Sequence, residues 1–176
     1  MSPTYLVLGL ILLLLLIIGG LYNGLVTRRN AVSNAFASLD ANLQKRFDLI
    51  PNVVATVKGT MTHERDTLEA LTMLRERGNR LGNEGASVQL IGQIMARAEA
   101  YPDLKASANF LHLQRTLNEI EEQISASRRA FNATVADYNN AVETFPSSLL
   151  ASSFGFARRD FYQAQSEARV APQIKM

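Results

Sequence analysis

Few residues of this sequence have the types and spacing that catalysis or metal binding requires. His63 and Glu64 begin a helical zinc-binding pattern, but Thr67 stands where its second histidine is needed. His112 lies between two leucines with no carboxylate at ligand spacing, so we expect a solvent-exposed histidine. The chain has no cysteine, which excludes disulfides, thiolate metal sites and a cysteine nucleophile. We therefore expect no metal, no cofactor and no catalytic residue.

Other ligand-binding patterns are equally poorly matched. The glycine-rich stretch from Arg75 to Gly85 follows a predicted helix rather than a strand and lacks the lysine of a phosphate-binding loop. The sequence contains no Gly-x-Ser-x-Gly elbow. A net charge of +2, basic residues scattered along predicted helices and the absence of tryptophan fit an anionic membrane surface at least as well as nucleic acid. We expect neither nucleic acid nor a small-molecule substrate as a partner.

The most informative polar residues form a stripe beside the apolar face of the last predicted helix. We expect Glu121 to pair with Arg46, and Arg128 to pair with a carboxylate of the first helix. Because an unpaired buried charge is costly, such pairs are more readily explained as fixing the register of packed helices than as catalytic groups. The stripe and its predicted partners are Asp40, Arg46, Asp48, Glu121, Ser125, Arg128, Asn132 and Asn139.

Helices are predicted to position these residues throughout. The strongest signal is a seven-residue repeat of large apolar side chains, without glycine or proline, which predicts a long helix covered by partner helices. That repeat comprises Phe110, Leu117, Ile124, Phe131, Tyr138 and Phe145. An earlier face with spacings of three and four comprises Val32, Phe36, Leu39, Leu43, Phe47 and Ile50.

Breaking residues divide the pattern into four helices. Pro51 ends, kinks or restarts the first helix, since proline lacks an N–H. Ser87 is expected to cap a third helix whose inward residues are Val88, Ile91, Met95 and Ala98. The fold class is therefore all-α: an N-terminal transmembrane helix followed by an antiparallel up-and-down four-helix bundle with a long C-terminal helix. The predicted helices are Asn23–Ile50, Asn52–Arg77, Ser87–Ala100 and Lys105–Thr144.

An apolar segment precedes these helices. No charged side chain occurs in residues 1–27, and the stretch from Tyr5 to Tyr22 spans roughly 27 Å as a helix, close to the hydrocarbon thickness of a bilayer. We predict a transmembrane anchor over residues 1–27 with the two tyrosines at the interfaces. Arg28 and Arg29 place the C-terminal domain in the cytoplasm and the N-terminus outside by the positive-inside rule. A cleaved signal peptide is the alternative, but a basic start is missing.

The composition changes after Pro146, where large apolar and basic residues lie close together. Residues 28–146 are predicted to form the helical domain, and residues 147–176 a Phe-rich membrane-proximal segment with an exposed tail. If the helices alternate in direction, this segment meets the lipid interface; the alternative is that its phenylalanines close the end of the bundle. The residues expected at this interface are Leu149, Leu150, Phe154, Phe156, Arg158 and Arg159.

Two blocks of residues resemble the LemA family of bacterial single-pass membrane proteins. The first comprises Arg29, Asn30, Val32, Leu39, Asp40, Leu43, Arg46, Asp48, Leu49, Ile50, Pro51, Asn52, Val57 and Lys58. The second comprises Tyr101, Pro102, Asp103, Leu104, Asn109, Phe110, Leu113, Gln114, Glu121, Arg128, Phe131, Asn132, Tyr138, Asn139, Phe145 and Pro146. The resemblance implies an N-terminal anchor in the bacterial inner membrane and an up-and-down helical bundle. It implies no enzymatic activity and no catalytic residues.

The sequence thus favours a non-catalytic, membrane-anchored helical scaffold. Its expected partners are the lipid bilayer and either copies of itself or other membrane proteins. The alternative is a membrane-remodelling protein that acts on lipid through the segment after Pro146. An enzyme is the third hypothesis, because the sequence offers no set of nucleophile, base and oxyanion donor.

Overall fold

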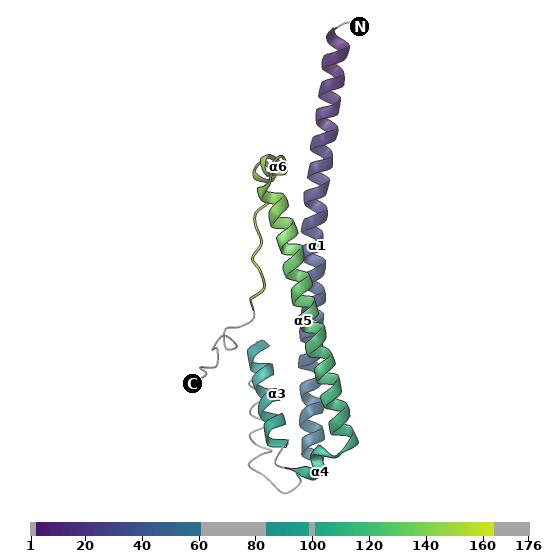
Figure 1. Ribbon diagram of the computed structural model, residues 1–176, viewed down its shortest axis with the longest axis vertical. Helices are drawn as coiled ribbons and strands as arrows, with labels where there is room; N and C mark the ends of the chain where they lie inside the picture. The colour runs from purple at the N-terminus through teal and green to yellow at the C-terminus, as the bar shows by residue number, and fades with distance from the viewer. Residues whose placement is uncertain (1–2, 61–83, 99–100, 164–176) are drawn as a thin grey trace, which may run out of the picture. The chain divides into compact units, whose positions relative to one another are not determined.

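Helices make up all the regular structure in the residues that the computed structural model describes, which are 3–60, 84–98 and 101–163 (Figure 1). The all-α prediction is confirmed for these ranges, whereas the four-helix bundle stays a prediction. The Gly-rich stretch up to residue 83 and most of the second predicted helix lie outside the described residues. The helices are α1 (Pro3–Thr60), α3 (Glu84–Ala98), α4 (Pro102–Lys105), α5 (Ala108–Glu143) and α6 (Ser147–Ser153).

The first helix, α1, is longer than predicted because it continues through Pro51. We expected two separate helices on either side of this proline, and that was wrong. An internal proline costs about 3 kcal/mol, since it removes one hydrogen bond and crowds the preceding turn. Ile50, Val53 and Val54 are all buried around it, and each buried aliphatic side chain contributes about 1.5–3 kcal/mol. Packing therefore outweighs the cost of the proline.

The N-terminal part of α1 is the one candidate membrane span in the described part of the chain. Its 18-residue apolar window has a mean hydropathy of 2.7, and 0% of that window is buried inside the protein. Large exposed side chains follow one another there from Tyr5 to Ile17. By length and composition this helix is long and apolar enough to cross a membrane, a property that membrane anchors share with signal sequences.

The chain divides into two compact units, and each contains a part of α1 and a part of α5. The first unit comprises Met1–Leu39 and Ser127–Tyr162, and the second comprises Asp40–Ala126 and Gln163–Met176. α6 belongs to the first unit, whereas α3 and α4 belong to the second.

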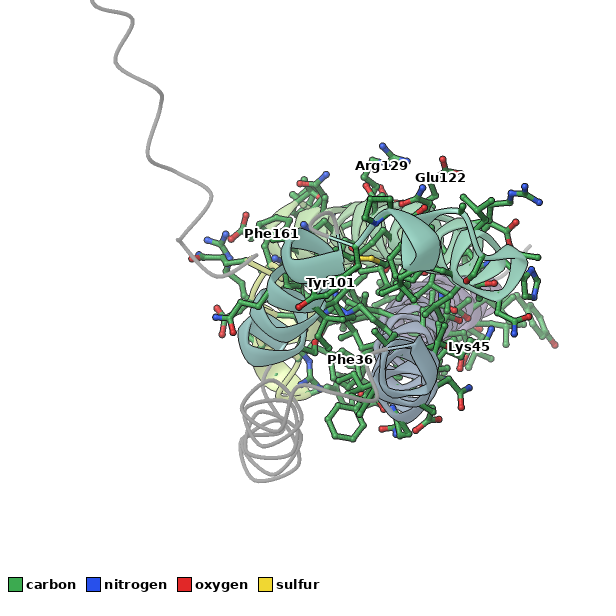
Figure 2. All side chains as sticks on the ribbon, turned by 90° about the horizontal axis from the view of Figure 1, so that it is seen from below. Phe36, Lys45, Tyr101, Glu122, Arg129 and Phe161 are labelled. Carbon is green, nitrogen blue, oxygen red and sulfur yellow. The ribbon has the colours of Figure 1, made fainter. Side chains whose placement is uncertain are left out.

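The second unit has its apolar core where α3 and α4 pack against α1 and α5. Charged side chains such as Lys45 of α1 and Glu122 of α5 point outward from the same helices (Figure 2). The amphipathic pattern of the sequence therefore separates a buried from a solvated face, as predicted. The core residues are Ile50, Val53, Val54, Ile94, Leu104, Phe110, Leu113 and Leu117.

The inward face of α3 matches the prediction at two residues and differs from it at others. α3 begins at Glu84, so Ser87 lies inside the helix and is buried rather than acting as its N-cap. Of the residues expected inside, Ile91 and Met95 pack against the core, as predicted, whereas Val88 is exposed. The prediction missed Ile94, which is fully buried, and the buried Ser87, which lies seven residues before it on the same helix face.

In the first unit, α5 packs along α1. Phe131, Val135 and Tyr138 of the predicted α5 seam are buried, as are Leu25, Val32 and Leu39 of α1. Phe36 of α1 is exposed (Figure 2) but makes an edge-on contact with Phe131, with ring centroids 5.8 Å apart.

The heptad repeat ends one member earlier than predicted. Phe145 was expected at the last core position, yet its side chain is 80% exposed. α5 ends at Glu143, and Pro146 disfavours helical backbone at the residue before it. The helical phase that buries Tyr138 therefore does not extend to Phe145.

The core assignment predicts different costs for the same substitution at two leucines of α5. Leu117→Ala leaves a cavity in the core of the second unit and should cost about 2–5 kcal/mol of unfolding free energy. Leu111→Ala, at an exposed position, should cost well under half as much. Thermal and denaturant unfolding of the full chain in detergent, followed by circular dichroism, measures both. Equal losses at the two sites would mean that the α5 seam is misplaced.

Candidate functional site

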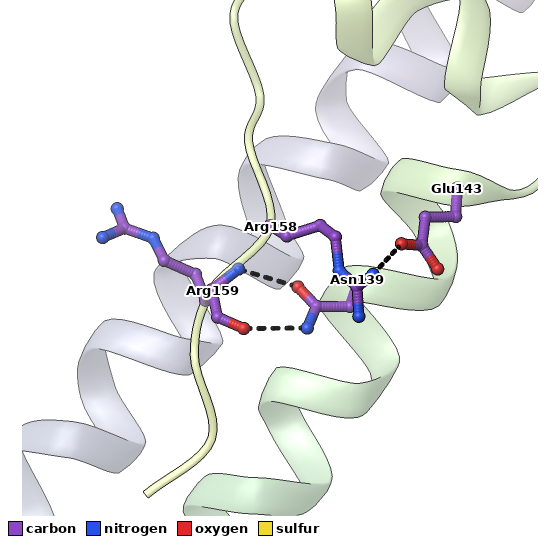
Figure 3. Close-up of polar contacts among 4 residues, drawn as sticks. All are labelled: Asn139, Glu143, Arg158 and Arg159. Atoms are coloured by element: carbon purple, nitrogen blue, oxygen red, sulfur yellow. Dashed lines mark hydrogen bonds and ion pairs between the residues drawn. The ribbon is translucent and has the colours of Figure 1, made fainter.

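The most specific polar arrangement in the described residues joins α5 to the chain that follows α6. The Asn139 side chain donates to the Arg159 carbonyl and accepts from the Arg159 N–H, both at 2.9 Å (Figure 3). Asn132 makes the same two bonds with Tyr162, at 3.2 and 2.8 Å. The Tyr138 hydroxyl donates to the carbonyl of Ala157 at 3.0 Å. We call residues 156–162 the C-terminal strap.

The spacing of the two asparagines matches the strap. Asn132 and Asn139 lie seven residues apart, which is about 10.5 Å along a helix. Arg159 and Tyr162 lie three residues apart, which is about 10 Å along an extended chain. The N–H and C=O of an extended residue point to the same side, so one amide side chain satisfies both. The asparagine side chains of α5 therefore bind the backbone of the strap, which runs antiparallel to the helix. Because only backbone groups of the strap take part, these contacts depend little on the side chains of the strap.

This arrangement corrects part of the predicted polar stripe. Asn132 and Asn139 were assigned to a stripe that fixes the register of packed helices, but their side-chain hydrogen bonds go to the strap. The guanidinium of Arg128 lies 5.6 Å from the ring centroid of Tyr162, within cation–π range. The pairing of Arg128 with Asp40 or Asp48 stays a prediction.

A glycine-based cap directs the chain from α6 into the strap. Gly155 has a φ of 72°, in the left-handed region that glycine adopts without steric cost. The N–H of Phe156 donates to the Ala151 carbonyl at 2.9 Å, which is the six-to-one bond of a Schellman motif. This turn brings Phe156 back toward α1.

An aromatic cluster joins the segment after Pro146 to α1. Phe156 is only 8% exposed and lies 5.7 Å from the Tyr22 ring, with the Arg29 guanidinium 5.5 Å from its centroid. Phe154 contacts Tyr22 at 5.1 Å. Both aromatic pairs have the edge-on geometry that contributes beyond burial. Tyr22 ends the apolar stretch of α1, so α6 lies beside the C-terminal end of that stretch (Figure 1).

Large apolar side chains remain exposed beside this cluster. Phe145, Leu149 and Phe154 are 80%, 62% and 57% exposed, and Leu150 is partly buried. We call these first three residues the exposed apolar cluster. The two alternatives for the segment therefore apply to different residues: Phe156 packs inside the unit, as a plug does, whereas the exposed apolar cluster faces outward.

The basic residues near this cluster make weaker contacts. Arg158 forms an ion pair with Glu143 at 2.8 Å (Figure 3), and because both side chains are exposed it contributes little stability. Arg159 is held by its backbone while its side chain points away. Arg28 is exposed at the start of the charged part of α1, and Tyr5 is exposed near its N-terminal end.

In the second unit, the predicted pairing of Arg46 with Glu121 is confirmed. Nη1 of Arg46 lies 2.7 Å from Oε1 of Glu121. The Arg46 side chain is 1% exposed and the Glu121 side chain 50%, so a fully buried cation has a partly solvated partner. Asp48 accepts a hydrogen bond from Gln44 at 2.8 Å, and Asp40 is exposed.

The described ranges contain no group of three or more histidine, cysteine or acidic side chains that could hold a metal. His112 is exposed on α5, as predicted, and His63 lies outside the described residues.

Comparison with known proteins identifies the family. A model of the LemA family matches residues 35–176, and this chain therefore belongs to the LemA family. Protein LemA of Metamycoplasma hominis is 26% identical over 159 residues, which cover 86% of this chain and 73% of that protein.

Two other relatives carry magnetosome names. Magnetosome protein MamQ of Magnetospirillum gryphiswaldense is 32% identical over 97 residues, and Magnetosome protein MamQ 2 of Paramagnetospirillum magneticum is 31% identical over 97 residues. Each alignment covers 53% of this chain and 36% of the relative, so the matched part of this chain spans about a third of the length of these magnetosome proteins.

The asparagine contacts predict that strap accessibility depends on α5. Asn132→Ala with Asn139→Ala removes four hydrogen bonds, each with a net contribution of about 0.5–1.5 kcal/mol, so the strap should detach at least about tenfold more often. Limited trypsin digestion after Arg158 and Arg159 should accelerate accordingly. Asn140→Ala, at the exposed neighbouring position, should leave the cleavage rate unchanged. An unaltered rate in the double variant would show that the asparagines do not hold the strap.

The buried cation predicts an asymmetric double-mutant cycle. Glu121→Gln leaves Arg46 charged and buried, so it should cost more unfolding free energy than Arg46→Met, and the double variant should cost less than the sum of the two. We expect a coupling on the order of 1–3 kcal/mol, between the values for exposed and buried pairs. The exposed pair of Arg158 and Glu143 is the control, with a coupling below about 0.5 kcal/mol. Denaturant unfolding measures all of these, and zero coupling for Arg46 with Glu121 would contradict the assignment.

Proposed function

We propose that this chain is a non-catalytic, single-pass scaffold of the bacterial inner membrane, with its helical region on the cytoplasmic side. The continuity of α1 carries the proposal, because the apolar stretch and the residues that pack in both units belong to one helix without a linker. A continuous helix is stiffer than a flexible linker of the same number of residues. The up-and-down four-helix bundle expected from the sequence is part of the same proposal.

Retention of the apolar stretch as an anchor is supported by the residues that follow it. Tyr22 contacts both Phe154 and Phe156, and Leu25 is fully buried. A signal peptide is removed from the mature protein and need not take part in its packing. Here the end of the apolar stretch contributes side chains to the packing of the first unit. Arg28 and Arg29 then follow on the proposed cytoplasmic side.

The residues that line two clefts in the described part of the chain support a non-catalytic function. One cleft, between α1 and α5, contains Ser147, whose hydroxyl donates to the Ala141 and Thr144 carbonyls at 2.6 and 3.0 Å. Another, between α3 and α5, contains Glu121, which pairs with Arg46. Neither set of lining residues brings a nucleophile to a base within the described part of the chain.

Cross-linking in native membranes tests the scaffold proposal. The chain has a mass of 19.4 kDa, and a scaffold that assembles with itself should give products at multiples of that mass, or adducts with other membrane proteins. Treatment with a lysine-reactive reagent followed by sizing in mild detergent shows this. A protein that gives no cross-linked product and elutes in mild detergent as a monomer without partners would contradict the proposal.

A second candidate function, membrane organisation through lipid contact, is favoured by the exposed apolar cluster. Its residues lie next to the ring contact between Phe154 and Tyr22, where the proposed anchor leaves the bilayer. Aromatic and aliphatic side chains beside arginines are typical of segments that enter the lipid interface.

Fluorophores can test lipid contact cleanly because the chain contains no native cysteine. An environment-sensitive probe on Leu149→Cys or Phe154→Cys should be quenched by brominated lipid in reconstituted vesicles. The same probe on Ala133→Cys, exposed on α5 five residues before Tyr138, is the control and should not be quenched. Probes at 149 and 154 that ignore the lipid would remove the support for the second candidate while leaving the scaffold proposal intact.

A further inference from the structure

A cleft of about 480 Å³ lies between α1 and the C-terminal end of α5, within the first unit. Its volume falls in the range of small-ligand pockets, about 300–1,000 Å³. Leu21, Leu25 and Arg28 of α1 line one side, spaced four and three residues apart on one helix face. Asp137 and Asn140 of α5 contribute to the opposite side.

The position of the cleft links it to the proposed membrane boundary. Leu21 precedes Tyr22, the last aromatic residue of the apolar stretch, and Leu25 lies one turn further along the same helix. Leu21 therefore continues the apolar surface of the proposed anchor, and the buried Leu25 lies beneath the cleft wall. Arg28 follows at the level where lipid headgroups meet water in that proposal. A molecule in this cleft would be apolar near Leu21 and polar near Arg28.

The charged groups of the cleft are available to a ligand. Nη1 of Arg28 makes a long bond of 3.4 Å to the Gly24 carbonyl of its own helix. Asp137 makes no hydrogen bond or ion pair with any residue in the described ranges, and it is exposed. One cation and one anion thus line the same cleft without an ion pair between them. Asn140 adds an amide that can donate or accept.

We propose that this cleft binds a phospholipid whose headgroup carries both a phosphate and a primary ammonium. This inference rests on the proposed membrane anchor. Arg28 binds the phosphate, Asp137 accepts hydrogen bonds from the ammonium, and the start of the acyl region lies along Leu21. An anionic headgroup without an amine leaves Asp137 facing negative charge. A quaternary ammonium has no N–H to donate to Asp137.

Lipid selectivity of the full chain tests this inference. The chain is reconstituted in vesicles containing equal amounts of phosphatidylethanolamine, phosphatidylglycerol and phosphatidylcholine, and the lipids it retains are measured by native mass spectrometry. Phosphatidylethanolamine should be enriched about three- to tenfold over each of the others, a modest factor because both charged groups are exposed to solvent. Soluble phosphoethanolamine should not displace it, because it lacks the acyl region; full displacement would assign the cleft to a water-soluble ligand and overturn the lipid proposal.

Matched variants separate the two charged groups. Asp137→Asn should abolish the preference for ethanolamine over choline, and Arg28→Gln should lower retention of all three lipids. Asp160→Asn and Arg129→Gln, exposed charges of the same unit, are the controls and should change neither. Preference for phosphatidylglycerol, or an ethanolamine preference that survives Asp137→Asn, would overturn the inference.

The same vesicles are extracted with alkaline carbonate. A chain that remains in the membrane but shows no ethanolamine preference disproves this inference alone. A chain released by carbonate disproves the membrane anchor, and the lipid site with it.

Discussion

Backbone recognition by two asparagines is the constraint on which the arrangement of the first unit depends. Asn132 and Asn139 bind residues Tyr162 and Arg159 of the strap, and this match between two helical turns and three extended residues fixes the strap along α5. With the strap fixed, the turn at Gly155 brings Phe156 onto Tyr22 and Arg29. The same contacts place the exposed apolar cluster at the end of the apolar stretch of α1.

The second constraint is that α1 does not break at Pro51. A break there would separate the candidate membrane span from part of the packed core by a joint. Instead, buried residues around the proline hold the helix, and α1 runs from Pro3 to Thr60. Burial of a few aliphatic side chains thus decides whether the helix continues through the proline.

Much of the fold could be predicted from periodicity, and its failures have physical causes. The seven-residue repeat placed α5 within a few residues of its observed ends, because a long uninterrupted apolar seam has few alternatives. It failed at Phe145, where a proline one residue later ended the helix. The proline rule failed at Pro51, where packing outweighed local propensity. On α3 the pattern identified Ile91 and Met95 but missed Ile94 and the buried Ser87.

The candidate site was harder to predict than the fold. Pairing of Arg46 with Glu121 was predictable because both partners are charged side chains on amphipathic helices. The partners of Asn132 and Asn139 are backbone groups, which the side-chain types of the strap do not reveal. A pair of asparagines a heptad apart, followed by a glycine-terminated short helix, is the signal that could have suggested a returning strand of chain. Whether Phe154 and Phe156 meet lipid or protein depended on that return and could not be decided from composition.

The most direct measurement of the central claim is thiol cross-linking in the membrane between two introduced cysteines. Tyr22→Cys combined with Phe154→Cys uses two positions whose ring centroids lie 5.1 Å apart, and we predict rapid cross-linking by a short bifunctional thiol reagent. Tyr22→Cys combined with Phe161→Cys, at the far end of the strap, is the matched control and should cross-link slowly. Equal rates for the two pairs, or no cross-link between positions 22 and 154, would contradict the account in which the strap holds this segment against α1.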